Sequence, residues 1–146
     1  MRPFRLQSVL DYRERLENEA RMSLGLCLEE QRTCLARKEQ KEAEVHRLQL
    51  ELQEAREKNN VLLPEVMLYE ECIAARKKDI LELDQKISIL NARVEQKNQA
   101  LVRARQEKKV LELLKAKRAE EERKKLRDQE NAFLDEVAVL GYGERQ

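Results

Sequence analysis

The sequence predicts an all-α protein in which two long helices form an antiparallel coiled-coil hairpin. Three features lead to this prediction: the composition, a single central break and a seven-residue repeat. Charged residues make up 40% of the 146 positions and aromatic residues 3%, with only three Gly and two Pro. Sheet proteins need turn residues about every 8–12 positions, and these are too few to supply them. Most of the remaining residues are strong helix formers.

The middle of the chain contains one convincing break, the sequence Asn-Asn-Val-Leu-Leu-Pro at residues 59–64. Asn tolerates the left-handed conformation that often ends a helix. Pro64 disfavours helix at Leu63 but suits the first turn of a new helix. A short connection normally returns the second of two long helices antiparallel to the first. The expected organisation is a single hairpin over residues 1–146, with helices at about 4–59 and 65–137, a turn at 59–64 and a frayed tail at 138–146.

The second helix carries a heptad repeat that starts at Val66. Ten of twelve positions at coiled-coil spacing are apolar, where the 41% apolar composition of the chain would give about five. β-branched residues occupy the first position of five successive heptads, which is typical of a helix that packs along a partner helix. The first positions are Val66, Ile73, Ile80, Ile87, Val94 and Leu101, and their companions are Tyr69, Arg76, Leu83, Leu90, Lys97 and Ala104.

The first helix has a weaker apolar pattern that polar residues interrupt. If the turn is near residue 62, the polar middle of this helix faces about residues 78–94 of the second helix. We therefore expect a thin core there, with part of the apolar stripe of the second helix exposed to a partner. The apolar positions are Leu6, Leu10, Ala20, Leu24, Cys27, Cys34, Val45, Leu48, Leu52 and Ala55, and the interruptions are Arg13, Glu17, Gln31, Lys38 and Lys41.

Charge is distributed unevenly near the C-terminal end, although the whole chain has a net charge of only +1. Residues 103–127 contain 11 basic and 5 acidic residues (net +6), and residues 128–146 contain 1 and 5 (net −4). Beyond about residue 118 the second helix is expected to extend past the start of the first. Such a segment suits docking on a protein, because charge sets the rate and orientation of encounter. A short apolar stripe follows the basic run: Leu126, Phe133, Val137 and Leu140.

The residue types exclude most catalytic and metal sites. His46 is the only histidine, so Ser-His-Asp, Cys-His and multi-histidine metal sites cannot form within one chain. There is no glycine-rich phosphate-binding loop, and the three cysteines are too widely spaced for a zinc site or a disulfide framework. No segment approaches the roughly 20 apolar residues of a membrane span, and the N-terminus is charged too early for a signal peptide. We expect a cytosolic protein that is not an enzyme, with no cofactor, metal or transmembrane segment.

Two other functions are compatible with such a coiled coil. Residues 103–127 could bind nucleic acid, with an affinity that falls as salt rises. No aromatic residue lies between Tyr69 and Phe133 to stack on bases, and basic-zipper proteins place the basic region before the heptads rather than after them. Nucleic acid is therefore not an expected partner. The chain could also be a structural oligomer in which another copy covers the first helix, so that its sedimentation coefficient would rise with concentration.

Three short motifs make the sequence more specific than a generic coiled coil. They are Phe4-Arg5-Leu6-Gln7-Ser8-Val9-Leu10 at the start, Tyr69-x-x-Cys72-Ile73-x-x-Arg76-x-x-x-Ile80 in the second helix, and Leu134-Asp135-Glu136-Val137-Ala138 near the end. With the total length and the central break, they resemble the bacterial flagellar export protein family FliJ over nearly the whole chain. Cys72 and Arg76 stand where that family usually has Phe and Leu. The similar stalk proteins of injectisomes are the alternative family.

The resemblance implies a soluble component of the flagellar type III export apparatus, with a fold similar to the rotor stalk of rotary ATPases. It implies three partners: the hexameric export ATPase, the cytoplasmic domain of the large export-gate subunit, and some export chaperones. The protein would then lie in the cytoplasm, peripheral at the inner membrane through its partners. The residues expected at the gate, unless they are merely core, are Tyr69, Cys72, Ile73, Arg76 and Ile80. Those expected to dock on the ATPase are Arg118, Arg123, Lys124, Lys125 and Arg127, with Phe133 and Val137 as anchors.

Overall fold

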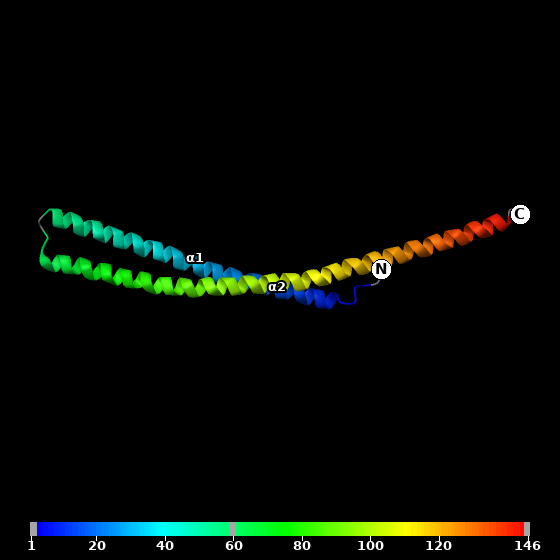
Figure 1. Ribbon diagram of the computed structural model, residues 1–146, viewed down its shortest axis with the longest axis horizontal. Coiled ribbons are helices and arrows are strands. Elements are labelled where there is room, and N and C mark those ends of the chain that lie inside the picture. The colour runs from blue at the N-terminus through cyan, green and yellow to red at the C-terminus, as the bar shows by residue number, and fades with distance from the viewer. Residues whose placement is uncertain (1–2, 59–60, 145–146) are drawn as a thin grey trace. The chain divides into compact units, whose positions relative to one another are not determined.

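The computed structural model describes residues 3–58 and 61–144, and these residues form two long helices. Helix α1 spans Gln7–Glu57 and helix α2 spans Leu63–Glu144 (Figure 1). Side chains of α1 pair with side chains of α2 in reverse order along the two helices, as Arg13 with Glu107 and Lys38 with Asp84 show. The predicted all-α, antiparallel two-helix fold is confirmed.

The ends of the helices at the turn differ slightly from the prediction. Helix α1 ends at Glu57, and Asn59 and Asn60, which begin the expected turn, lie outside the described residues. Helix α2 begins at Leu63 rather than at residue 65, so Pro64 lies in its first turn. The carbonyl oxygen of Leu62 accepts hydrogen bonds from the amides of Glu65 and Val66, at 3.0 and 3.1 Å. Proline is tolerated there because the first amides of a helix have no partner within the helix.

The C-terminal end of α2 is a clear correction. The expected frayed tail from residue 138 is helical as far as Glu144, so Gly141 and Gly143 lie within α2. Glycine lowers helix stability by about 1 kcal/mol relative to alanine, but it ends a helix only where it takes the left-handed conformation. Neither glycine has a backbone φ in that region, so the helix continues.

The chain divides into two compact units. The first, which we call the turn unit, is Glu19–Leu101 and contains the parts of α1 and α2 that adjoin the turn. Its most buried apolar side chains are Cys34, Val45, Leu52, Leu90 and Leu101, which retain between 1% and 8% of their exposure. All five lie at predicted coiled-coil positions, so the seam between the two helices is the core of this unit.

The second unit, the terminal unit, combines residues 3–18 with residues 102–144. Leu10 of α1 is buried here, with 4% exposure, and so is the carboxylate-bearing side chain of Glu17. Pairing between the two helices reaches as far as Lys115 and Arg118, which contact Gln7 and Phe4. Every residue from Lys115 to Gly143 is exposed, and the red end of α2 has no helix beside it in Figure 1.

Candidate functional site

The polar residues that interrupt α1 in the turn unit pair with α2. The Lys38 ammonium lies 2.7 Å from Asp84 and the Lys41 ammonium 3.7 Å from Asp79. The Gln31 amide nitrogen donates a 2.5 Å hydrogen bond to Asn91. These partners lie within the stretch of residues 78–94 that was expected to face them, and Ile80, Leu83, Ile87 and Val94 of that stretch are only half-buried. The polar side chains of α1 form interhelical pairs in this part of the seam.

Arg76, a charged residue at a heptad position of α2, is also paired across the seam. The Arg76 guanidinium lies 2.7 Å from the Glu44 carboxylate of α1, so an ion pair replaces the apolar contact that a Leu would make. The hydrogen bond and the charge of Asp84 raise the pKa of Lys38 above its ordinary value of 10.5. Lys38 is therefore held as a cation within the seam, where it keeps its pair with Asp84.

The terminal unit contains the most buried charge among the described residues, Glu17, whose side chain is 5% exposed. Its carboxylate lies 2.5 Å from the Lys108 ammonium and 3.4 Å from the Arg105 guanidinium. The hydrogen bond to Glu17 raises the pKa of Lys108. One helical turn before Glu17 on α1, the Arg13 guanidinium lies 2.5 Å from the Glu107 carboxylate. Thus Arg13 and Glu17, which interrupt the apolar pattern in the sequence, also face partners on α2.

The five residues predicted to contact the export gate lie together at the start of α2 in the turn unit, and each is half-buried. The Tyr69 hydroxyl donates a 3.4 Å hydrogen bond to Glu51 of α1. Burial is the main cause that raises the pKa of this hydroxyl above 10.0, and the negative charge of Glu51 raises it further. Tyr69, Ile73, Arg76 and Ile80 occupy the heptad seam, so α1 covers one side of each. Only their remaining exposed edges, with that of Cys72, are open to a partner.

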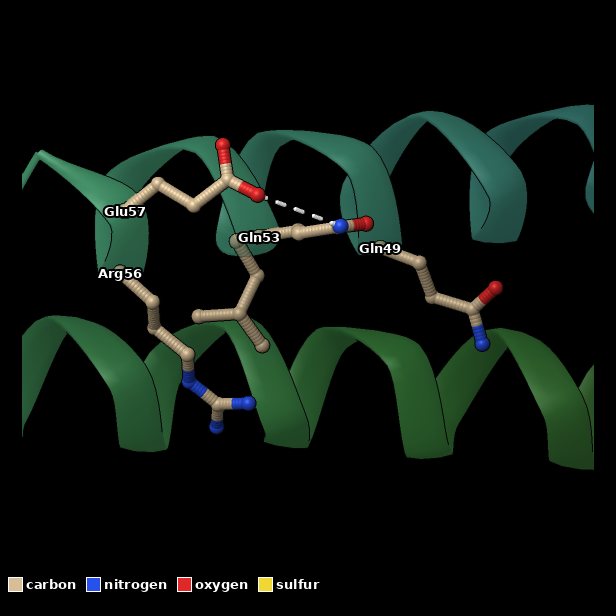
Figure 2. Close-up of a pocket in the computed structure, with 5 residues that line it drawn as sticks. Gln49, Gln53, Arg56 and Glu57 are labelled. Carbon is tan, nitrogen blue, oxygen red and sulfur yellow. Dashed lines mark hydrogen bonds between the residues drawn. The ribbon is translucent and has the colours of Figure 1, made fainter.

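A surface pocket lies near the turn but brings none of the predicted site residues together. It is lined by Gln49, Leu52, Gln53, Arg56 and Glu57 of α1. Figure 2 shows the Gln53 amide donating to Glu57 along the helix, at 3.4 Å. The Arg56 side chain extends towards α2 (Figure 2), where it lies 3.3 Å from Glu70. All five lining residues belong to α1, so the pocket is a shallow feature of the surface of one helix.

The residues predicted to dock on the ATPase are all on the exposed part of α2. Arg123 and Arg127 both lie near Glu120 of the same helix, at 3.7 and 3.3 Å. Phe133 and Val137 are 65% and 48% exposed. The structure therefore places basic and apolar groups along one helix and presents both to solvent. Each is accessible to a partner without any rearrangement of the two-helix fold.

Some features of this surface are absent from the sequence prediction. The Arg118 guanidinium lies 5.5 Å from the centre of the Phe4 ring, a cation–π contact that joins the lead-in of α1 to α2. Leu134, Val139 and Tyr142 are also at least 60% exposed. Continuing the count of sevens from Val66 would have placed Lys108 in the seam opposite α1. Glu17, by contrast, was already included in the sequence analysis as an interruption of the apolar pattern of the first helix.

The described residues contain neither a metal-binding cluster nor a membrane-spanning stretch. Across residues 3–58 and 61–144, no three His, Cys, Asp or Glu side chains are grouped so that they could hold a metal ion. Neither helix, over the part that the structure describes, has a stretch long and apolar enough to cross a membrane.

Two long helices that pair side chains in antiparallel order place the protein in the class of two-helix coiled coils. The family model described as Flagellar FliJ protein matches residues 1–146, the whole chain, and the protein belongs to this family. It is therefore a protein associated with flagellar export, in a family of non-catalytic export components. No curated protein and no solved structure matched the chain.

Proposed function

We propose that this protein is a stalk or adaptor that docks in the hexameric flagellar export ATPase and couples it to the export gate and to export chaperones. The observation that carries the proposal is the run of exposed α2 residues from Lys115 to Gly143. This run presents a basic cluster and a set of apolar side chains without a covering helix in the described chain. A single helix is about 10–12 Å in diameter with its side chains, which is narrow enough to enter a ring.

The basic cluster, Arg118 with Arg123, Lys124, Lys125 and Arg127, would orient the helix on the ATPase. Lys124 and Lys125 form no ion pair among the described residues, and Arg123 and Arg127 share the exposed carboxylate of Glu120. Exposed pairs of this kind contribute at most about 1 kcal/mol, so they exchange easily for contacts with a partner. Charges at such a surface mainly raise the encounter rate and fix the orientation.

Phe133 and Val137 would anchor the docked helix. They lie four residues apart, and therefore on one face of α2, with 65% and 48% exposure. Burying a large apolar side chain contributes about 1.5–3 kcal/mol. This is enough for two such residues to hold a docked stalk while still allowing it to leave.

The test reverses three charges together, Arg123→Glu, Lys124→Glu and Arg127→Glu, and measures stimulation of the purified export ATPase at low and high salt. We expect stimulation to fall at least about tenfold at low ionic strength, and less at high salt, because salt screens the lost attraction. Circular dichroism should show unchanged helicity. The matched control reverses three exposed lysines of the turn unit, Lys77, Lys78 and Lys86, and should stimulate normally. Normal stimulation by the first variant at low salt would locate the docking surface elsewhere.

The gate contact is proposed for the exposed edges of Tyr69, Cys72, Ile73, Arg76 and Ile80. Tyr69→Ala separates contact from packing, and Tyr69→Phe removes only the hydroxyl that donates to Glu51. Loss of binding to the gate's cytoplasmic domain by Tyr69→Ala, with an unchanged melting temperature, supports contact. Losses of binding and stability in the same proportion would mean that Tyr69 serves only the core. Through these partners the protein would lie at the cytoplasmic face of the inner membrane.

A further inference from the structure

Within the exposed part of α2, residues 123–136 divide into a basic half and an acidic half. Residues 123–127 contain four basic and no acidic side chains, and residues 128–136 contain four acidic and no basic ones. All of these residues are exposed, and no residue of α1 pairs with them among the described contacts. One helix surface therefore carries both partners of an electrostatic contact, side by side along its length.

The apolar side chains of this segment have the spacing of a second coiled-coil seam. Leu126, Phe133, Val137 and Leu140 are separated by seven, four and three residues, so they lie on one face of the helix. Their exposure is between 48% and 69%. Isolated helices gain little stability from propensity alone and depend on packing of an apolar face. This face has the pattern for such packing, but no helix in the described part of the chain covers it.

We propose that the partner of this face is the same face of a second copy, packed antiparallel about a two-fold axis near Asn131 and Ala132. In this register Leu126 of each molecule lies opposite Val137 of the other, and the two Phe133 rings lie close to the axis. Arg127 of each molecule lies opposite Glu136 of the other. Two-fold symmetry makes every one of these contacts twice.

The charge pattern selects both the occupant and its direction. Antiparallel pairing places the basic half of one helix near the acidic half of the other, with Lys124 and Lys125 within one turn of Asp135 and Glu136. Parallel pairing would align basic with basic and acidic with acidic, which is repulsive. Because the basic half of this helix complements its acidic half, a second copy packed antiparallel supplies an opposite charge for each half.

Self-pairing also covers the anchors proposed for ATPase docking, Phe133 and Val137. A molecule would therefore pair either with a second copy or with the ATPase, but not with both through this helix. The inference goes beyond the proposed function and does not depend on it, because the paired state is measured with the purified protein alone.

Sedimentation velocity over a dilution series tests the proposal. We expect a monomer–dimer equilibrium for the unchanged protein. Reversing the basic half with Lys124→Glu and Lys125→Glu should raise the dimer dissociation constant at least about tenfold, because attraction becomes repulsion at both symmetry-related places. Adding Asp135→Lys and Glu136→Lys to this variant reverses both halves and should restore most of the affinity. Phe133→Ser should abolish the dimer without changing the helicity of α1.

The control is Lys77→Glu with Lys78→Glu, which changes the net charge equally on the exposed face of the turn unit and should leave the dimer constant unchanged. A protein that remains monomeric up to its solubility limit would overturn the proposal. So would a dimer that survives both Phe133→Ser and the reversal of Lys124 and Lys125. A dimer that is not restored by the fourfold reversal would overturn the antiparallel arrangement.

Discussion

The seam of the turn unit and the exposed end of α2 are built from similar residues, but their surroundings differ. In the turn unit, Leu90 retains 1% of its exposure and Lys38 is paired across the seam with Asp84. On the exposed end, Leu134 retains 60% of its exposure and Lys124 has no ion-pair partner in the described chain. Leucines and lysines are thus structural in one region and open to partners in the other.

The difference shows that the polar content of a heptad position does not decide whether that position is core. Gln31, Lys38 and Lys41 occupy core positions because α2 offers Asn91, Asp84 and Asp79 at matching heights. Beyond Arg118, no described residue of α1 covers α2, and α2 is exposed as far as Gly143. The exposed end lacks a complement among the described residues of α1, and for this reason we propose it as the surface for partners.

Introducing a charge in each region should give the largest contrast. Leu90→Asp should lower the free energy of unfolding by about 3–5 kcal/mol, because it removes a buried side chain and buries an unpaired carboxylate. Leu134→Asp makes the same chemical change at a 60% exposed position of the same helix, and should change it by less than about 0.5 kcal/mol. Urea unfolding followed by circular dichroism measures both. Equal losses in the two variants would mean that the exposed end is part of the core.

Removing the partner of a buried charge should have an intermediate effect. Lys108→Met removes the ammonium that lies 2.5 Å from the 5% exposed Glu17 carboxylate, and should cost about 2 kcal/mol because a buried charge loses a close partner. Lys109→Met, at the exposed neighbouring position, is the matched control and should cost almost nothing. Adding Glu17→Leu to Lys108→Met should recover most of the loss, because no buried charge then remains. If the double variant is no more stable than Lys108→Met, the carboxylate is not the source of the cost.

Alkaline pH should weaken the paired region by the smallest amount. The hydrogen bonds to Asp84 and Glu17 raise the pKa of Lys38 and of Lys108 above 10.5. A raised pKa means that the folded state binds the proton more tightly, so this stabilisation is complete below about pH 10 and is lost as the pH rises through the folded-state values. Above about pH 10.5 the melting temperature of the unchanged protein should therefore fall more steeply than that of the double variant Lys38→Met with Lys108→Met. Identical pH profiles for the two proteins would show that these pairs do not stabilise the fold.

The sequence was sufficient to predict the helices, their direction and most of the seam. The spacing of Val66, Ile73, Ile80 and Ile87 alone defines a face that must pack against a partner. The single break at residues 59–64 makes α1 that partner. The family also followed from short motifs at the two ends, because side chains such as Phe4 and Leu134 lie where the heptad pattern does not require them.

Heptad spacing and the central break could not predict which residue of α2 pairs with each polar residue of the seam. Whether Lys38 faces Asp84 or Ile80 depends on the register of α1 against α2 to within one turn, and the turn position was known only approximately. The end of α2 was also missed, because Gly141 and Gly143 are common beyond helix ends but do not require one. The register of α1 against α2 and the end of α2 are both positions along the helix axis, and composition and periodicity do not determine them.

Amide hydrogen exchange on the diluted, monomeric protein tests the central claim most directly, because it reports the protection of each part of α2. The account predicts slow exchange over residues 66–104, where α1 covers the helix, and exchange faster by at least about a hundredfold over residues 126–142, where no helix does. Equal protection of the two segments in the monomer would contradict it, since the exposed end would then be held by contacts that this two-helix structure does not contain.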